Sequence, residues 1–237
     1  MSRPRIRRFP NLAALASGAA EDLVDCIERA IGEQGRCRIA MAGGSTPRPV
    51  YHLLAGQDLA ARIEWNRVDV FWGDERCVSP ADSASNYRMV QDELLSRVPI
   101  LERNVHRIEG ERPPDDAARA YAETLGEDPL DIVLLGMGDD GHTASLFPGT
   151  PGLGRHEERV IATVGPVAPI RRVSLTLRAI NEAATVRFWV SGATKAKPVA
   201  EVFRQIESGA RELPAARVRP RSGRLLWMVD AAAAEKL

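Results

Sequence analysis

Short apolar runs alternate with segments of helical periodicity along almost the whole chain, and this alternation constrains the fold more than any other feature. The expected strands are residues 37–42, 68–72, 105–108, 130–135, 160–164, 173–177, 185–191 and 225–229, and the expected helices are residues 12–31, 115–125, 194–208, one beginning at Pro47 and one following Ser85-Asn86. Strands that alternate with helices predict an α/β fold with a mainly parallel, Rossmann-like sheet covered by helices on both faces. Because no linker, repeat or composition break divides the chain, we expect a single domain over residues 1–237.

Composition excludes several classes of protein. The 32 basic residues balance 32 acidic ones, which argues against a broad basic face for nucleic acid, and the 5% aromatic content argues against base-stacking platforms. Only three of the basic residues are lysines. Cys26, Cys37 and Cys77 form no CxxC pair and leave one cysteine over, so we expect neither a disulfide framework nor a zinc ribbon, and a reducing cytoplasmic setting.

Residues 2–8 are basic and an apolar stretch follows them, a pattern that is typical of a signal peptide. The stretch is alanine-rich, however, runs directly into Glu21-Asp22 and keeps helical spacing as far as Ile31. An amphipathic helix therefore explains it better. No apolar run approaches the length that a bilayer requires, so no membrane partner is expected.

In a parallel sheet, ligands bind at the carboxyl ends of the strands, so we expect the functional residues in the loops that follow the strands. Gly43, Gly44, Ser45 and Thr46 lie between a strand and the helix that begins at Pro47. Glycines allow close approach of the backbone to an anion, and a helix amino terminus offers free N–H groups. These residues indicate a phosphate or carboxylate site; the alternative is an ordinary turn with Ser/Thr capping.

Two further loops place charged residues at strand ends. Asp74, Glu75 and Arg76 follow one strand, and they form either a paired, buried group or a solvated charged turn. Lys195 stands at a helix start, where the helix dipole favours an acid. An anion between the lysine and the helix would explain this placement, and the alternative is a lysine that points into solvent.

The loop at residues 136–148 contains a literal G-x-G-x-x-G, which raises the possibility of a dinucleotide site. The context argues against it, because Pro148 follows too soon for the long helix that this fingerprint opens. Asp139 and Asp140 would also face the pyrophosphate.

His142 lies beside these carboxylates, in a glycine-rich turn at a strand end. A histidine side chain normally titrates near neutrality, so the position indicates proton transfer. The other histidines, His52, His106 and His156, are scattered without ligand spacing, so no metal site is expected.

Three motifs together resemble the glucosamine-6-phosphate isomerase/6-phosphogluconolactonase superfamily. They are Gly-Gly-Ser-Thr-Pro at 43–47, Gly-Asp-Glu-Arg at 73–76 with Ser-Asn-Tyr at 85–87, and Gly-His-Thr-Ala-Ser-Leu-Phe-Pro at 141–148. The resemblance covers nearly the whole chain. Arg76, and Thr-Ala-Ser-Leu at 143–146, resemble the lactonases, since the deaminases have tyrosine and Ile-Ala-Phe-Asn there. The chain departs from the commonest family form at Ser79 and Asp139, both often proline.

The resemblance implies hydrolysis of 6-phospho-D-glucono-1,5-lactone to 6-phospho-D-gluconate in the oxidative pentose phosphate pathway, by a monomer that uses no cofactor. The small-molecule partner would be this sugar-phosphate lactone. His142 would be the general base, with Asp74 or Asp140 orienting it. Arg76 would face the developing negative charge or the product carboxylate. The backbone of Gly43, Gly44, Ser45 and Thr46, with Arg172 and Lys195, would hold the 6-phosphate.

Two other functions remain open. The first is a glucosamine-6-phosphate deaminase-like isomerase, in which Asp74 would abstract the proton. The second is a non-catalytic sugar-phosphate sensor, which would have no reason to keep His142 and Arg76 together.

Overall fold

The computed structural model describes residues 5–154 and 157–237. His156 and the first residues of the basic start lie outside this part. Among the described residues, the main sheet has six strands in the order β1-β9-β8-β5-β2-β3, and every neighbouring pair is parallel. The strands are β1 Arg5–Phe9, β2 Cys37–Met41, β3 Val68–Trp72, β5 Ile132–Leu135, β8 Thr185–Val190 and β9 Arg224–Asp230. The prediction of a mainly parallel α/β fold is confirmed.

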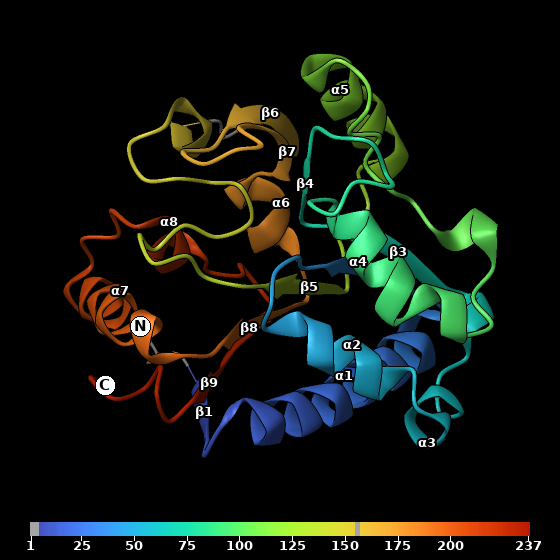
Figure 1. Cartoon of the computed structure of the whole chain (residues 1–237), viewed down its shortest axis with the longest axis horizontal. Coiled ribbons are helices and arrows are strands. Elements are labelled where there is room, and N and C mark those ends of the chain that lie inside the picture. Colours follow the sequence, from blue (N-terminus) through green and yellow to red (C-terminus); the bar gives the residue numbers. More distant parts are fainter. Residues whose placement is uncertain (1–4, 155–156) are drawn as a thin grey trace.

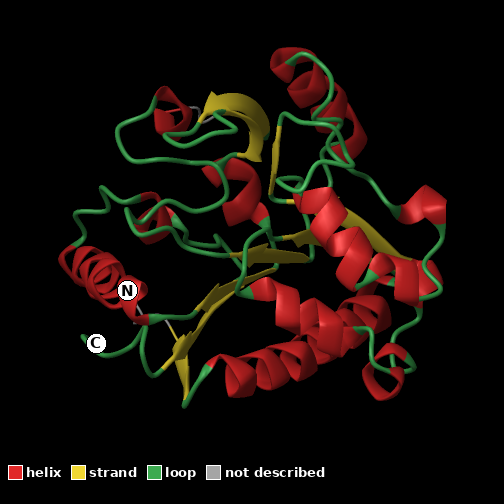
Figure 2. Cartoon of the chain, in the orientation of Figure 1, coloured by secondary structure: helices red, strands yellow, loops and turns green. Residues whose placement is uncertain are grey.

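Helices cover both faces of this sheet. They are α1 Leu12–Gln34, α2 Pro47–Leu54, α3 Gln57–Ala60, α4 Asn86–Glu93, α5 Pro114–Leu125, α6 Leu177–Glu182, α7 Ala196–Ser208 and α8 Pro214–Arg217. Figure 1 shows α1 and α2 on one side of the sheet and α6, α7 and α8 on the other, and Figure 2 shows the strands enclosed between them. Every residue of β2, β5 and β8 is buried, as expected for strands covered on both faces.

The helix expected at residues 12–31 forms as α1 and runs three residues further. Asn11 begins it by accepting a hydrogen bond from Ala14 N at 2.9 Å, and Gly35 ends it with φ of 77°. Its apolar face packs against β1, β2, β8 and β9. In the part of the chain that the structure describes, no helix is both long and apolar enough to span a bilayer.

A second, smaller sheet corrects three expectations. It is antiparallel, in the order β4-β7-β6, with β4 Asp74–Arg76, β7 Arg171–Leu175 and β6 Val160–Val164. The charged segment at 74–76 is therefore a strand and not a loop, and residues 160–164 and 173–177 do not join the parallel sheet. The strand expected at 173–177 ends at Leu175, because Thr176 caps α6 and accepts from Ala179 N at 3.4 Å.

Two other expectations concern single strands. Residues 105–108 form no strand: Val105 makes an isolated bridge to Val70 alone. The prediction was wrong because only Val105 of this run pairs with another strand, and a single bridge does not make a strand. Conversely, the basic start from Arg5 onward forms β1, which pairs with β9; its arginines concealed the pattern of a strand.

The topology brings the loops of interest to one place. Strands β8, β5, β2 and β3 are consecutive neighbours, so the loops that follow them meet at the carboxyl edge of the sheet. β4 continues from the end of β3 and brings β7 to the same edge.

Candidate active site

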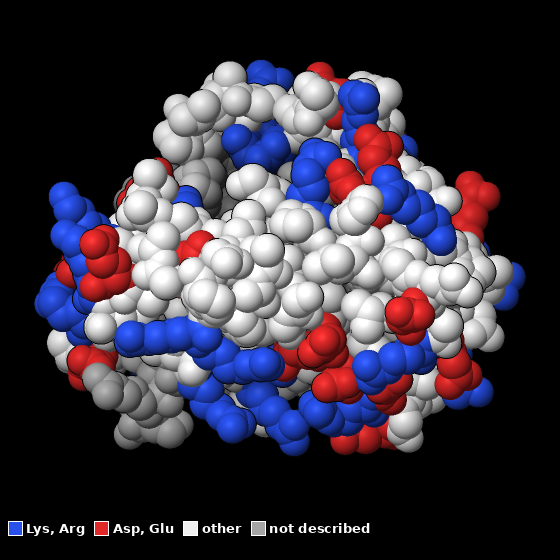
Figure 3. Space-filling model, turned by 60° about the horizontal axis from the view of Figure 1, so that its bottom comes forward, with Lys and Arg blue, Asp and Glu red and all other residues white. Residues whose placement is uncertain are grey.

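A cavity of about 230 Å³ lies at this carboxyl edge. Figure 3 shows a hollow in the upper part of one face of the molecule, with Lys and Arg side chains at its border. The site residues expected from the sequence that line the cavity are Gly43, Gly44, Ser45, Thr46, Asp74, Arg76, His142, Arg172 and Lys195. Asp140 does not line the cavity but contacts His142.

His142 and Asp140 form a close pair. The Nδ1 atom of His142 lies 2.6 Å from Asp140 Oδ1, which also accepts a hydrogen bond from the His142 backbone at 3.0 Å. The imidazole packs against the Phe147 ring, with 4.5 Å between centroids. This geometry fixes the orientation of the ring, with Nδ1 bound to the carboxylate.

The pair depends on the absence of a side chain at Gly138. A Cβ there would lie 2.0 Å from His142 Nδ1 and 2.8 Å from Asp140 Oδ1. The imidazole therefore lies directly over the backbone of Gly138, and this position in the loop requires glycine.

Asp74 has other partners. Its Oδ2 accepts from Ser145 Oγ at 2.6 Å and its Oδ1 from Asn86 Nδ2 at 3.4 Å, and the side chain is buried. The sequence left open whether Asp74 or Asp140 lies against His142, and the structure places Asp140 there. Asp74 instead joins the loop after β5 to the beginning of α4.

Glu75 was not among the site residues expected from the sequence. It is 3% exposed, and its carboxylate accepts from the backbone N–H groups of Arg76, Asn86 and Tyr87 at 2.7–2.8 Å and from Ser85 Oγ at 3.0 Å. Burial raises the pKa of Glu75, against the effect of these hydrogen bonds. Glu75 thus holds the amino terminus of α4 against β4. An acidic residue some ten positions before a Ser-Asn helix start is the signal that was available in the sequence.

Arg76 and Arg172 are neighbours, because the register of β4 and β7 sets their Cα atoms opposite each other. Arg76 Nη1 donates to Ala84 O at 2.6 Å, and its buried Nε has no hydrogen-bond partner among the described residues. Arg172 donates to Pro169 O at 2.6 Å and to Val167 O at 3.2 Å. Desolvation, and next the charge of Arg76, lower the pKa of Arg172. Neither forms an ion pair with a described carboxylate, so both offer positive charge to the cavity.

The loop before α2 has the features of an anion site. Thr46 is the N-cap of α2 but its side chain makes no capping hydrogen bond, contrary to the alternative of a simple Ser/Thr-capped turn. Gly44 is exposed with φ of 102°, which favours glycine. A Cβ at Gly43 would lie 1.9 Å from Asn86 Oδ1, so this glycine allows the close approach of α4.

Lys195 lies immediately before α7 and points toward Asp139. Its Nζ lies 2.5 Å from Asp139 Oδ1, and Thr194 Oγ1 donates to the same oxygen at 3.4 Å. The hydrogen bond from Lys195 lowers the pKa of Asp139. An anion was expected beside Lys195 because the positive end of a helix dipole favours negative charge. In the structure this anion is the carboxylate of Asp139.

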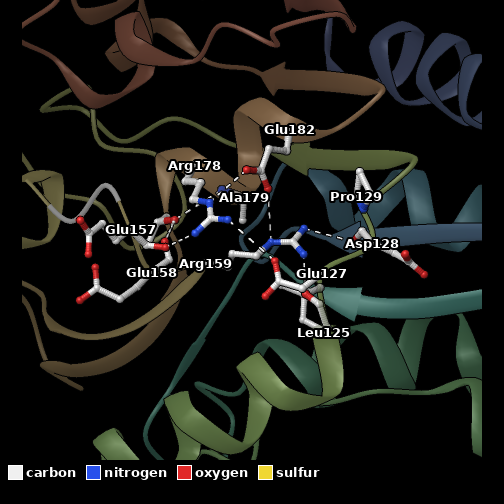
Figure 4. A network of polar contacts seen from close by, with 12 residues as sticks. Leu125, Glu127, Asp128, Pro129, Glu157, Glu158, Arg159, Arg178, Ala179 and Glu182 are labelled. Atoms are coloured by element: carbon white, nitrogen blue, oxygen red, sulfur yellow. Dashed lines mark hydrogen bonds and ion pairs between the residues drawn. The ribbon is translucent and has the colours of Figure 1, made fainter.

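A second cluster of buried arginines lies at the opposite edge, where β2 and β5 begin. Arg38 donates to Asp128 O and Leu125 O at 2.5 Å and to Pro129 O at 3.1 Å. Figure 4 shows Arg159 between the same loop and Glu182. Arg159 donates to Gly126 O, and to Asp128 O at 3.1 Å, and its Nε lies 3.4 Å from Glu182 Oε2. These guanidinium groups hold the loop that leads into β5.

The structure bears on two other expectations. Residues 142–150 form turns, and no helix follows Gly141 directly. A dinucleotide site of the G-x-G-x-x-G kind would need a long helix there. Within residues 5–154 and 157–237, no group of three or more His, Cys, Asp or Glu side chains could hold a metal ion. His52 contacts Glu93 and His106 contacts Asp69, away from the cavity.

Known proteins resemble the chain over nearly its whole length. A family model described as glucosamine-6-phosphate isomerases/6-phosphogluconolactonase matches residues 10–227. A 6-phosphogluconolactonase of Nostoc is 40% identical over 97% of this chain and 96% of its own length, and that of Rattus norvegicus is 36% identical over 95% and 89%. The crystal structure of 6-phosphogluconolactonase from Thermotoga maritima has 31% identity and a TM-score of 0.84, over 96% of this chain and 99% of that one.

Proposed function

The chain belongs to the glucosamine-6-phosphate isomerase/6-phosphogluconolactonase family, and from this membership and the cavity we propose that it hydrolyses 6-phospho-D-glucono-1,5-lactone to 6-phospho-D-gluconate, the lactonase step of the oxidative pentose phosphate pathway. One observation supports this most directly. A single cavity joins His142, which pairs with Asp140, to Arg76 and Arg172, neither of which forms an ion pair with a carboxylate of the described residues. A phosphorylated lactone needs both: proton transfer at the ring and positive charge for its anionic groups.

The reaction follows from the positions of these groups. The imidazole of His142 takes a proton from water, and the water oxygen bonds to the lactone carbonyl carbon. Negative charge then develops on the carbonyl oxygen, where the guanidinium of Arg76 stabilises it. When the bond from that carbon to the ring oxygen breaks, the imidazolium returns the proton to the ring oxygen, and the open-chain acid is released. Asp140 keeps Nδ1 engaged throughout, so the other ring nitrogen, Nε2, handles the proton.

The phosphate is assigned to the loop before α2 and to Lys195. Pro47 and Pro49 have no N–H group, so the backbone donors available here are those of Gly44, Ser45, Thr46 and Arg48. These donors, and the hydroxyl of Thr46, which makes no capping hydrogen bond, support this assignment. Arg172 was expected at the phosphate as well, but its neighbour in the sheet is Arg76. We therefore propose that Arg172, besides its expected contact with the phosphate, adds positive charge beside Arg76 in the cavity.

The same proposal extends to the whole protein. One continuous core runs from Leu15 in α1 to Ala234 after β9, which supports a single domain over residues 1–237. Cys26 and Cys37 are unpaired and buried, which supports a reducing, cytoplasmic setting. The lactone cavity is built from one chain, which supports a monomer.

The direct test replaces His142 with Ala and follows opening of the phosphorylated lactone above its spontaneous rate. We expect a loss of at least about 100-fold in kcat, the usual contribution of general acid–base catalysis. His106→Ala is the matched control, since His106 also pairs with an aspartate, Asp69 at 3.0 Å, but lies outside the cavity. A loss of less than about tenfold on replacing His142 would show that the base lies elsewhere.

The same preparation distinguishes the deaminase alternative. Glucosamine 6-phosphate is supplied in place of the lactone and released ammonia is measured. We expect none above the blank, because Arg76 and the segment after His142 have the lactonase form. Ammonia release that requires Asp74, without lactone opening, would reverse the assignment.

A further inference from the structure

The ion pair between Asp139 and Lys195 leads to an inference about substrate selection. Lys195 lines the cavity together with the loop before α2, and its side chain is 22% exposed. It is the N-cap of α7, so the positive end of the helix dipole lies beside it. A lysine in this position attracts an anion strongly, and any anion that reaches the cavity would meet it.

In the structure that position is taken by the carboxylate of Asp139. Its Oδ1 accepts from both Lys195 Nζ, at 2.5 Å, and Thr194 Oγ1, at 3.4 Å. No other carboxylate of the described residues lies within ion-pair distance of Lys195. Asp139 belongs to the loop after β5 and Lys195 to the loop after β8, so the pair joins the ends of two neighbouring strands beside the cavity, which Lys195 lines.

The exposure of Asp139 makes this pair easy to exchange. The side chain of Asp139 is 65% exposed, so its carboxylate can return to water without a large desolvation cost. Exposed ion pairs contribute only a factor of about 1.5 to 5 to an equilibrium. A phosphate dianion has a higher charge than the carboxylate and would also meet the free N–H groups of the loop before α2, so it can displace Asp139 from Lys195.

We propose that Asp139 is an internal competitor for the substrate phosphate, pairing with Lys195 when no anion is bound and released from it when a phosphate dianion binds. Asp139 thus sets the anion affinity of the site through Lys195. This inference rests on the proposed function in one respect, the assignment of Lys195 to the phosphate. It adds that a carboxylate at this position lowers the affinity for every anion by the same factor, so that at low concentration only anions with a high intrinsic affinity for the site, such as a phosphate dianion, bind.

The experiment measures binding of inorganic phosphate and of 6-phosphogluconate by titration calorimetry at constant ionic strength. In D139N, we expect both dissociation constants to fall by about 2- to 5-fold, because the neutral amide no longer competes. Inhibition by chloride should strengthen at the same time. With the phosphorylated lactone, KM should fall by the same factor while kcat is unchanged, a split that a purely structural role would not produce.

Two further variants decide whether the effect passes through Lys195. Asp128→Asn is the matched control: Asp128 is 72% exposed and forms an ion pair with Arg36 at 2.9 Å, outside the cavity, so binding should not change. In the K195M background, D139N should have no further effect. Unchanged or weaker phosphate binding in D139N, or a full effect of D139N without Lys195, overturns the inference. Because calorimetry needs no turnover, a protein that fails to open the lactone would refute the proposed function and leave this result readable.

Discussion

Two pairs of arginines that are buried or partly buried lie at opposite edges of the fold, and they differ in what surrounds the charge. Arg38 and Arg159, where β2 and β5 begin, are surrounded by backbone carbonyls, and Arg159 also by Glu182. In the small sheet, Arg76 has one carbonyl acceptor and Arg172 has two, and neither forms an ion pair with a carboxylate of the described residues. Three of the four are similarly buried, at 6–8% exposure. Burial alone therefore does not separate the arginines proposed to act on the substrate from those that hold the loop before β5, whereas the number of acceptors around each pair does.

Replacing Arg76 by Met gives the largest effect and tests the functional pair. We expect kcat/KM for the phosphorylated lactone to fall by about 100- to 1000-fold, since the variant removes the group proposed to stabilise the developing charge. Thermal stability should be unchanged or higher, because an unpaired cation next to Arg172 is lost. Steady-state kinetics and thermal unfolding check both. Arg171→Met is the control, from the exposed start of the same strand β7. Loss of stability on replacing Arg76 would contradict the comparison.

Replacing Arg159 by Met should give the opposite outcome. The variant leaves the carbonyls of Gly126 and Asp128, and the carboxylate of Glu182, without this donor. We expect the free energy of unfolding to fall by about 2–4 kcal/mol, while the activity of the folded protein is retained. Urea denaturation provides the measurement. Arg178→Met shares the contact with Glu182 but is 34% exposed, and it should cost less than about 1 kcal/mol. An Arg159 variant that is stable but inactive would abolish the distinction between the two edges.

Gly138→Ala tests whether the proposed site at the carboxyl edge of the sheet depends on the exact position of the His142 imidazole. The added methyl group would overlap the imidazole of His142, so the ring must move. We expect kcat to fall by about 10- to 100-fold with little change in KM, since small displacements of a catalytic group have effects of this size. In the same loop, a Cβ at Gly136 meets no other atom within 4 Å, and Gly136→Ala should stay within a few-fold of the parent. Equal losses in the two variants would mean that the loop, and not the imidazole, is affected.

Asp140→Asn should have the smallest effect of these. The amide can still contact His142 but has no charge to stabilise the imidazolium that forms during proton transfer, so we expect about a tenfold loss in kcat. KM should change little, because Asp140 does not line the cavity, and steady-state kinetics with the phosphorylated lactone checks both values. Asp74→Asn is the comparison, because Asp74 contacts Ser145 and Asn86 and not His142. Equal losses of kcat in both variants would contradict the assignment of Asp140 as the residue that orients His142.

The sequence predicts the parallel sheet and the location of the cavity well, because both depend on local patterns. A buried strand followed by glycines and a helix start is visible within a dozen residues, as at Gly43 and Gly44. The order of the strands and the convergence of their loops then follow from general rules for α/β folds.

The small sheet could not be predicted in the same way. Asp74, Glu75 and Arg76 have no apolar alternation, and they become a strand because they pair with a segment roughly a hundred residues later in the chain. Which carboxylate pairs with Lys195 or with His142 likewise depends on contacts between segments that are distant in the sequence. The pairing of Lys195 with Asp139, and the choice of Asp140 over Asp74 as the neighbour of His142, required three-dimensional positions.

The parallel pairing of β1 with β9 has a consequence for synthesis of the protein. The segment at Arg5–Phe9 leaves the ribosome before its partner Arg224–Asp230, which is made more than roughly 200 residues later. At about 5–20 residues per second, the first strand waits roughly 10–40 seconds for a neighbour. During that interval it is an open edge that other nascent chains can join. Arg5, Arg7 and Arg8 are exposed in the finished fold, and their repulsion discourages such pairing. The arginine-rich start thus protects the chain before it stabilises the sheet.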